Sequence, residues 1–351
     1  MYRRGSSNRE KIVRVRERLE VSELFKAYYS LRPEVEAPSD VTYREFAFQL
    51  FKDDVYVRHI SFDSAEDLEK YLALESPKNA YYSVARYELP SAPNMDEKGW
   101  LGSELMFDID VDHIEGCRDG LGDNCLLKGY SYARRLAEML YRDFSIAPYI
   151  YFTGNRGFHV IGDCDWCRDL DRRERRELTT YFTLEGLDLD LIIPLRLKRG
   201  KPVKPSPSDP GLRGWIGREL EARGLDVIDK SVLEEIVEYV RIPIDVQVTQ
   251  DISRLARIRG TLNGKAGLRV VRVGMNGFSL GSWLSPFKGE VVFRSTRGLD
   301  HMRVLGETVE LVEGREYSLP AHIAVYLQLK GYGVVVKGEI VVRADSSRGT
   351  I

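Results

Sequence analysis

The alternation of apolar and polar side chains predicts most of the strands. Every second side chain of a strand faces the same way, so alternation marks a strand with one buried face. The pattern predicts two strands within residues 44–60, joined by a turn at residues 52–54. Further strands are predicted at residues 81–89, 104–111, 148–153, 158–161, 241–248 and 268–273.

Apolar residues that return every three or four positions predict the helices. This spacing favours helices at residues 10–29, 65–74, 130–144, 212–223 and 231–239. Ser64 is the expected N-cap of the second helix, because Asp67 follows it by three residues. A last helix is expected to begin at Pro320 and to end at Gly331. Strands and helices are interspersed, so the fold class is α+β, or α/β with a mixed sheet.

One stretch differs from the rest of the chain. Residues 168–238 are polar and mainly helical, with a charged run at 168–177 and a loop rich in Lys, Pro and Gly at 197–214. We therefore interpret residues 168–238 as a helical insertion into a core formed by residues 1–167 and 239–351. A chain of 351 residues is long enough for one large domain with such an inserted module.

The composition excludes several classes of protein. Hydrophobic residues make up 43% of the chain, which excludes global disorder. With 52 Lys and Arg against 54 Asp and Glu, the net charge of −2 excludes a uniformly basic protein but not nucleic-acid binding through one basic face. No apolar run approaches the roughly 20 residues of a membrane helix. Residues 1–10 lack the apolar segment of a secretion signal, so the cytoplasm is the expected compartment.

The strongest candidate for chemistry is the pair Asp108 and Asp110. They lie two residues apart on a predicted apolar strand, so both side chains point to one face. Neighbouring carboxylates raise each other's pKa unless a cation lies between them. Hard cations such as Mg²⁺ prefer carboxylate oxygen and phosphate, and two such ions catalyse phosphoryl displacement. The alternative is a D-x-D string without function, and Asp112 is interpreted as a solvated residue that opens the following loop.

Two further segments carry side chains suited to phosphate. At the turn 153–159, two glycines permit a tight turn, Arg156 offers a charged fork, and His159 offers a hydrogen bond. Asp245 precedes a basic run that could neutralise a triphosphate or a nucleic-acid backbone: Arg254, Arg257, Arg259, Lys265 and Arg269. From the residues alone, an ordinary hairpin and a solvated basic face remain open as alternatives.

In this order, the segments resemble the archaeo-eukaryotic primase superfamily, and within it the small catalytic subunits of archaeal DNA primases. The similarity extends from about residue 28 to residue 333. It includes motifs at residues 44–46, 56–59, 82–88, 98–100, 107–110, 154–159, 245–267 and 319–326. The resemblance implies an enzyme that makes short primers on single-stranded DNA from NTPs, and from dNTPs as a second substrate class, with Mg²⁺ or Mn²⁺ as cofactor.

The resemblance also implies roles for individual residues. Metal binding and catalysis fall to three aspartates: Asp108, Asp110 and Asp245. Contacts with the nucleotide's phosphates fall to four residues: Arg156, His159, Arg257 and Lys265. Two more candidates for nucleotide contacts lie in motifs near the active site: Glu45 and Arg58. The chain departs from the family in Asn263, where His is usual, and in Thr153 and Asn155, where small or basic residues are commoner.

The chain has four cysteines: Cys117, Cys125, Cys164 and Cys167. The resemblance implies a zinc knob after the strand 104–111, and a closed zinc site needs four ligands. Three alternatives remain open. All four cysteines hold one zinc ion, or His113 or Asp123 completes a knob with the first two, or no zinc binds and disulfides form instead, as they do inside cells of hyperthermophiles.

Primer synthesis is the leading interpretation, with two alternatives. One is a repair or plasmid-type primase-polymerase that extends existing ends, and the other is an inactive nucleic-acid-binding subunit. The resemblance further implies a heterodimer with a large primase subunit. The candidate docking surface is residues 212–239, unless their apolar side chains form the insertion's own small core. These side chains are Trp215, Ile216, Leu220, Leu233, Ile236 and Val237.

Overall fold

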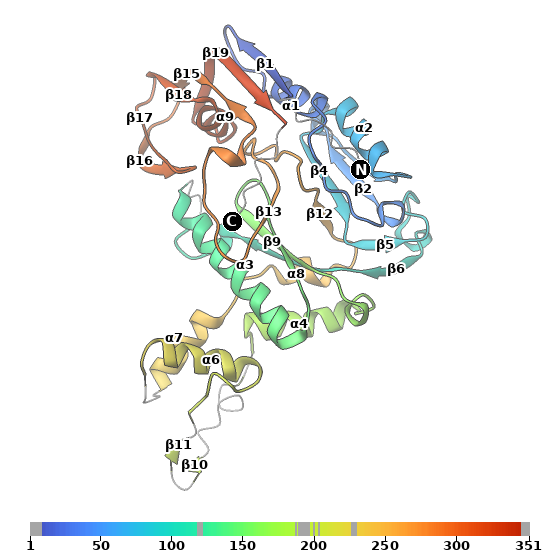
Figure 1. Ribbon diagram of the computed structural model, residues 1–351, viewed down its shortest axis with the longest axis vertical. Coiled ribbons are helices and arrows are strands. Elements are labelled where there is room, and N and C mark those ends of the chain that lie inside the picture. Colours follow the sequence, from blue (N-terminus) through green and yellow to red (C-terminus); the bar gives the residue numbers. More distant parts are fainter. Residues whose placement is uncertain are drawn as a thin grey trace, which may run out of the picture.

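Figure 1 shows a computed structural model of the chain, which describes residues 9–117, 122–186, 188, 197–198, 201–202, 204–225 and 230–344. Its elements in chain order are β1 (Glu10–Val15), α1 (Val21–Ser30), β2 (Phe46–Gln49), β3 (Tyr56–Ile60), α2 (Ala65–Glu75), β4 (Asn79–Ser83), β5 (Ala85–Tyr87), β6 (Trp100–Ser103), β7 (Leu105–Asp110), α3 (Asp123–Phe144), β8 (Tyr149–Phe152), β9 (Gly157–Gly162), α4 (Arg172–Thr183), β10 (Leu197–Lys198), β11 (Lys201–Pro202), α6 (Gly211–Ala222), α7 (Lys230–Val240), α8 (Val246–Gln250), β12 (Leu255–Arg257), β13 (Val271–Val273), β14 (Phe287–Lys288), β15 (Glu290–Ser295), β16 (Leu299–Val304), β17 (Glu307–Leu311), β18 (Glu316–Pro320), α9 (Ala321–Leu329) and β19 (Gly333–Arg343).

The sheet that carries the candidate acids has the strand order β13-β8-β9-β7. On β7, Phe107 and Ile109 are fully buried, and Asp108 and Asp110 alternate with them and therefore face the other side. The helix α3 packs along β7, β8 and β9. The sequence pattern of β7 thus places an apolar face on the core and leaves an acidic face open.

Two further sheets flank this one. The strands β12-β4-β2-β3 form the first, and a small apolar cluster joins it to the acid-bearing sheet through Val84, Met106, Ile161, Val248 and Ala256. The second has the order β1-β19-β15-β18, with β14 paired to β19, and α9 packs against β19. No helix within the described ranges is long and apolar enough to cross a membrane.

The α+β class is confirmed, but the expected mixed sheet is wrong for the strands described. Every pairing in the three larger sheets is antiparallel. The connection through α3 does make β7 and β8 run in the same direction. However, β9 lies between them and pairs antiparallel with both, because a short turn joins β8 to β9.

Several predicted elements are confirmed and two are wrong. Ser64 caps α2 by accepting a hydrogen bond from the Asp67 amide, and Pro320 precedes α9 as expected. The predicted helix at 10–29 is instead β1 followed by α1, because residues 10–15 pair with β19 at the other end of the sequence. The predicted strand at 241–248 contains the start of α8 instead, because the Asp245 side chain accepts hydrogen bonds from the amides of Gln247 and Val248.

The helices α6 and α7 pack on each other and lie apart from the sheets, below α3 and α4 in Figure 1. Trp215 of α6 donates from Nε1 to Asp143 of α3 at 2.8 Å, and Arg135 of α3 lies 4.0 Å from the ring centroid of Tyr239. Five of the side chains expected to dock a partner are buried: Trp215, Ile216, Leu220, Leu233 and Ile236. A docking surface built on these side chains is therefore wrong, since they serve the local core. The boundaries 168–238 stay a prediction.

Arg175, on α4, links the sheet that carries Asp108 and Asp110 to the segment that carries Asp245. Arg175 is 1% exposed. Its guanidinium donates to the backbone carbonyls of Leu170 and Cys167, at 2.8 and 3.5 Å, and to those of Glu104 and Ser103, at 3.0 and 2.9 Å. The last two precede β7. At the other end of α4, the Phe182 carbonyl accepts from the Ile242 amide, and α4 packs on α8.

Replacing Arg175 with Leu is expected to lower the free energy of unfolding by about 3 kcal/mol, because buried carbonyls lose their donors. Chemical denaturation measures this change. Arg173→Leu is the matched control on the same helix, since the Arg173 side chain is 85% exposed, and its effect should stay within about 0.5 kcal/mol. Equal losses in the two variants would contradict a supporting role for Arg175.

Candidate active site

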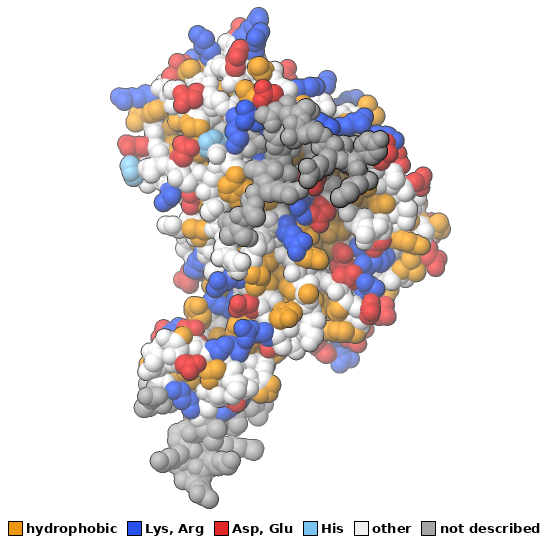
Figure 2. All heavy atoms as spheres, viewed as in Figure 1, with side chains coloured by type: hydrophobic (Ala, Val, Ile, Leu, Met, Phe, Trp, Pro, Cys, Tyr) orange, Lys and Arg blue, Asp and Glu red, His pale blue; other side chains and the backbone are white. Residues whose placement is uncertain are grey.

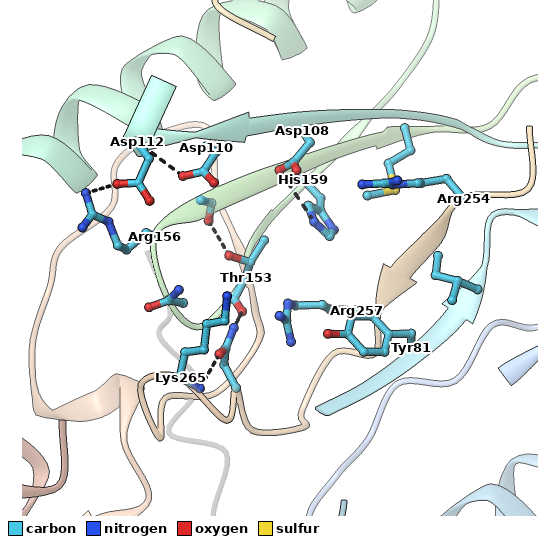
Figure 3. A pocket seen from close by; sticks show the side chains of 15 residues that line it. Tyr81, Asp108, Asp110, Asp112, Thr153, Arg156, His159, Arg254, Arg257 and Lys265 are labelled. Carbon is cyan, nitrogen blue, oxygen red and sulfur yellow. Dashed lines mark hydrogen bonds and ion pairs between the residues drawn. The ribbon is translucent and has the colours of Figure 1, made fainter. Parts of the chain in front are cut away.

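A cavity of about 260 Å³ lies over the acidic face of β7. Five segments supply its walls: β4 through Tyr81, β7, the turn from β8 into β9, β12, and the loop that contains Asn263 and Lys265. Figure 3 shows Asp108 and Asp110 projecting from β7 toward the side where Arg257 and Lys265 lie. The cavity therefore has an acidic wall and a basic wall.

The pairing of β7 with β9 determines which groups meet. Asp108 is directly opposite His159, and Asp110 is opposite Gly157. The His159 Nε2 atom lies 3.8 Å from Asp108 Oδ1. Gly154 begins the turn at φ +77°, and a Cβ atom there would come within 2.8 Å of the Leu268 carbonyl oxygen. Glycine at this position lets the turn approach the loop of Asn263 closely.

Asp245 reaches the site from α8. Its backbone amide donates to the Asp108 carbonyl at 3.0 Å, and its Oδ1 atom accepts from the amides of Gln247 and Val248. Asp245 does not line the cavity. Within the described residues, no group of three or more His, Cys, Asp or Glu side chains has the arrangement of a formed metal site. The structure brings the three aspartates into one neighbourhood without closing them around a point.

Burial and like charge raise the pKa of Asp108 to about 6. Desolvation is the largest cause, followed by the charges of Asp110 and then Asp245. Burial lowers the pKa of His159 to about 3, with smaller contributions from Arg257 and Arg254. His159 is therefore neutral at pH 7. The Asp108 carboxylate is thus costly to ionise although Arg254 and Arg257 partly offset this cost, and carboxylate oxygens are the ligands that hard divalent cations prefer.

The basic wall contains more arginine than the sequence assignment recognised. Arg257 lines the cavity, donates to Asn79 Oδ1 at 2.7 Å and lies 4.9 Å from the ring centroid of Tyr81. Arg254, which is exposed, lines the same wall, whereas Arg259 pairs with Glu36 elsewhere. Arg254 precedes β12 and Arg259 follows it, so the course of the chain on either side of this short strand decides which arginines reach the cavity.

In the turn between β8 and β9, two groups fix the side chain of Arg156. It pairs with Asp112, and its Nη2 atom donates to the Cys117 carbonyl at 2.7 Å. The interpretation of Asp112 as a merely solvated residue is therefore wrong. Asn263 has a structural role: its Nδ2 atom donates to the Thr153 carbonyl at 2.8 Å, and its Oδ1 atom accepts from the Lys265 amide at 2.9 Å.

Glu45 and Arg58 lie outside this cavity. The Glu45 side chain has no exposed surface, and its carboxylate lies 3.1 Å from Arg58 Nε and 3.4 Å from Nζ of the equally buried Lys98. Direct contact between Glu45 and a nucleotide is not supported by this placement. Arg58 lines a neighbouring cavity of about 250 Å³, which shares Tyr81 and Arg254 with the first cavity.

The cysteines form two disulfides, Cys117–Cys125 and Cys164–Cys167. The prediction of zinc bound by all four cysteines is not supported, because each sulfur is bonded to another sulfur and offers no thiolate. The knob completed by His113 or Asp123 meets the same objection, and Asp123 instead accepts hydrogen bonds from the amides of Leu305 and Gly306.

Sequence comparisons decide the family. Residues 107–275 match the model of the DNA primase small subunit family. The chain is 64% identical over 335 residues to the DNA primase small subunit of Aeropyrum pernix, covering 95% of this chain and 98% of the relative. The chain belongs to the DNA primase small subunit family. As primase small subunits are nucleotidyltransferases, the chain is an enzyme of that class.

More distant primase small subunits match over nearly the same length. The relative from Sulfolobus acidocaldarius is 36% identical over 339 residues, covering 90% of this chain and 94% of the relative. The polymerase domain of Mycobacterium tuberculosis ligase D in complex with DNA shares 11% identity and a TM-score of 0.38, over 73% of this chain and 80% of that one. A likeness of that size supports no conclusion about this primase.

In the metal-free primase, Asp108→Asn is expected to raise the free energy of unfolding at pH 7 by about 1–3 kcal/mol. The folded-state pKa of Asp108, about 6, lies above the ordinary 3.8, so the charged form is unfavourable in the folded protein. This destabilisation is absent below about pH 4, grows as the pH rises to about 6, and is complete above it.

Urea unfolding with a chelator at pH 4 and pH 7 measures the difference. Asp165→Asn is the control, since the Asp165 side chain is 98% exposed, and it should change stability by less than about 0.5 kcal/mol. A stabilisation by Asp108→Asn that is the same at both pH values would contradict the raised pKa.

Proposed function

We propose that this cavity is where the primase joins nucleotides during primer synthesis on single-stranded DNA. One observation carries the proposal: two carboxylates on β7 face a wall of arginine and lysine across a space of about 260 Å³. A nucleoside triphosphate with divalent cations matches both walls, because its phosphates suit the basic wall and its cations suit the acids.

Asp108, Asp110 and Asp245 are the residues that would hold Mg²⁺ or Mn²⁺. The donor set fits, because these are hard carboxylate oxygens, and burial followed by the charges of Asp110 and Asp245 makes the ionised form of Asp108 unfavourable without a cation. Asp110 and Asp245 also each accept hydrogen bonds from backbone amides through Oδ1, which orients both carboxylates. Bound divalent ions would lower the pKa of a primer 3′-hydroxyl and stabilise the pyrophosphate that leaves.

The other residues bind and orient the nucleotide. Arg156 and Lys265 lie at the same end of the cavity in Figure 3 and are assigned to the phosphate chain. Arg254 and Arg257 lie toward the opposite end and neutralise phosphate charge there. His159 is neutral at pH 7, so it acts as a hydrogen-bond donor or acceptor and not as a cation.

A large primase subunit is the proposed partner, since the family is defined as the small subunit of a primase. Acidic and basic side chains are interspersed over the face shown in Figure 2, and the net charge is −2. Such a surface gives little long-range attraction to DNA, so contacts supplied by a partner would help to retain the template. The proposed compartment is the cytoplasm, where an archaeal chromosome is replicated.

Incubation with unprimed single-stranded DNA, Mg²⁺ or Mn²⁺, and labelled NTPs or dNTPs tests the function. Dinucleotide formation supports primer synthesis. Extension of supplied primers without dinucleotide formation would favour the alternative, a primase-polymerase of the repair or plasmid type. Absence of both reactions, alone and with the large subunit, would leave only a nucleic-acid-binding role.

Asp108→Asn, Asp110→Asn and Asp245→Asn are each expected to reduce synthesis to background, because an amide does not replace a carboxylate at a divalent ion. Asp245 offers a matched comparison. Asp245→Asn keeps an oxygen for the helix cap and should keep its stability, whereas Asp245→Ala should also lose about 1 kcal/mol of unfolding free energy. Substantial synthesis by any Asn variant would contradict the assignment.

Arg156→Ala is expected to raise the apparent KM for nucleotide about 10- to 100-fold, because a charged contact contributes roughly 1.5–3 kcal/mol. Binding of template DNA should change little. Steady-state kinetics and a DNA-binding titration measure the two effects, with Arg294→Ala as the control, since Arg294 pairs with Glu316 on the sheet of β15 and β18. An unchanged KM would remove Arg156 from the nucleotide site.

A further inference from the structure

Lys330 reaches the edge of the cavity from a distant part of the chain. It is the residue that ends α9, and its Nζ atom donates to Asn155 Oδ1 in the turn between β8 and β9. Its ammonium also lies 5.2 Å from the ring centroid of Tyr326. Lys330 is half-buried, although it does not itself line the cavity.

Close packing holds α9 beside the cavity. Gly267 follows the loop of Asn263 and Lys265, and a Cβ atom added there would lie 3.2 Å from side-chain atoms of both Val325 and Leu329. At such distances α9 has little freedom to shift relative to that loop. The position of Lys330 is therefore set by the core and not by a flexible segment.

The chemistry of lysine determines how the amide of Asn155 is turned. An ammonium group has only hydrogen-bond donors, so it must meet the carbonyl oxygen of the amide. The NH₂ group of Asn155 then points away from Lys330. Asn155 lines the cavity together with Arg156 and Lys265, the residues assigned to the phosphate chain. An oriented amide donor thus stands among the phosphate-binding cations.

Positive charge accumulates at this end of the cavity. Burial, followed by the charges of Arg156 and Lys265, lowers the pKa of Lys330 to about 8, and Asp112 opposes this shift. Asp112 is already paired with Arg156. An anion bound here would relieve the repulsion among the three cations.

We propose that Asn155 donates a hydrogen bond to the phosphate chain of the incoming nucleotide, and that Lys330 is a positioning residue that orients this amide and adds positive charge behind it. The inference rests on the proposed function, because it takes the cavity to be the nucleotide site. It assigns part of nucleotide binding to α9, whose sequence lies far from the acids and from the turn.

Equilibrium binding of NTP, NDP and NMP in the presence of Mg²⁺ tests the proposal without requiring synthesis, and steady-state kinetics follow. Asn155→Ala and Lys330→Met should each weaken NTP binding and raise the apparent KM about three- to tenfold, with kcat little changed. Because Lys330 acts through Asn155, the double variant should bind NTP about as tightly as whichever single variant binds it less tightly. Lys330→Arg should restore part of the affinity.

Lys288→Met is the matched control. Lys288 is also half-buried and donates to a backbone carbonyl, that of Ser282, but it lies on β14 and outside the cavity. The Lys288→Met variant should bind NTP as tightly as the unaltered primase does. The loss caused by Lys330→Met should be greatest for NTP and smallest for NMP, since the effect acts through phosphate.

The outcomes separate this inference from the proposed function. Equal losses for NTP, NDP and NMP, or lower stability with unchanged NTP affinity, would reduce the pair to a structural bridge and overturn the inference. Additive effects in the double variant would overturn the positioning role. If Lys330→Met does not fold, the NTP affinities of Asn155→Ala and Lys330→Arg still test the inference. Failure of the unaltered primase to make dinucleotides while it binds NTP would instead refute the proposed reaction.

Discussion

The antiparallel register of β7 and β9 is the constraint on which the candidate site depends. It places Asp108 against His159 and Asp110 against Gly157, so the acids meet the turn that carries Arg156. A slip of one residue would turn both acids into the core and bring Phe107 and Ile109 out of it. Since those two side chains are fully buried, the apolar face of β7 fixes where the acids lie.

Two walls of opposite charge follow from that register, and each repels itself. Burial, followed by the charges of Asp110 and Asp245, raises the pKa of Asp108, and burial, followed by the charges of Arg156 and Lys265, lowers the pKa of Lys330. Under the proposed function, divalent cations would relieve the first repulsion and phosphates would relieve the second.

Local patterns in the sequence predicted the parts of the site that depend on local structure. The alternation in residues 104–111 correctly placed Asp108 and Asp110 on one face of a strand. The sequence predicts Asp245 on a strand, but it caps α8, because the chain before it is placed by a hydrogen bond from the Ile242 amide to the Phe182 carbonyl of α4, far away in the sequence. The sequence does not single out Arg254 for nucleotide contacts, since only the fold shows that it lines the cavity while Arg259 pairs with Glu36.

The misplaced elements depend on partners far along the chain. Residues 10–15 have helical spacing, yet they pair with β19 at positions such as Glu10 and Arg343. Glu45 is a carboxylate in a motif expected near the active site, but it is buried, and its carboxylate pairs with the buried Lys98. Likewise, the cysteine spacing could not distinguish a zinc site from disulfides, because the choice depends on which sulfur atoms the fold brings together.

The pairing of β1 with β19 also constrains how the chain folds. Glu10 and Arg343 are joined by a side-chain hydrogen bond although they are 333 positions apart, so this sheet closes a very long loop. Closing it costs more chain entropy than the turn that joins β8 to β9, and such contacts form late. On the ribosome, β7 and β9 are made well before α9 and β19, and the packing of α9 against β19 waits for this last strand to emerge. During synthesis the strands that carry Asp108 and Asp110 are therefore available long before the helix that ends at Lys330.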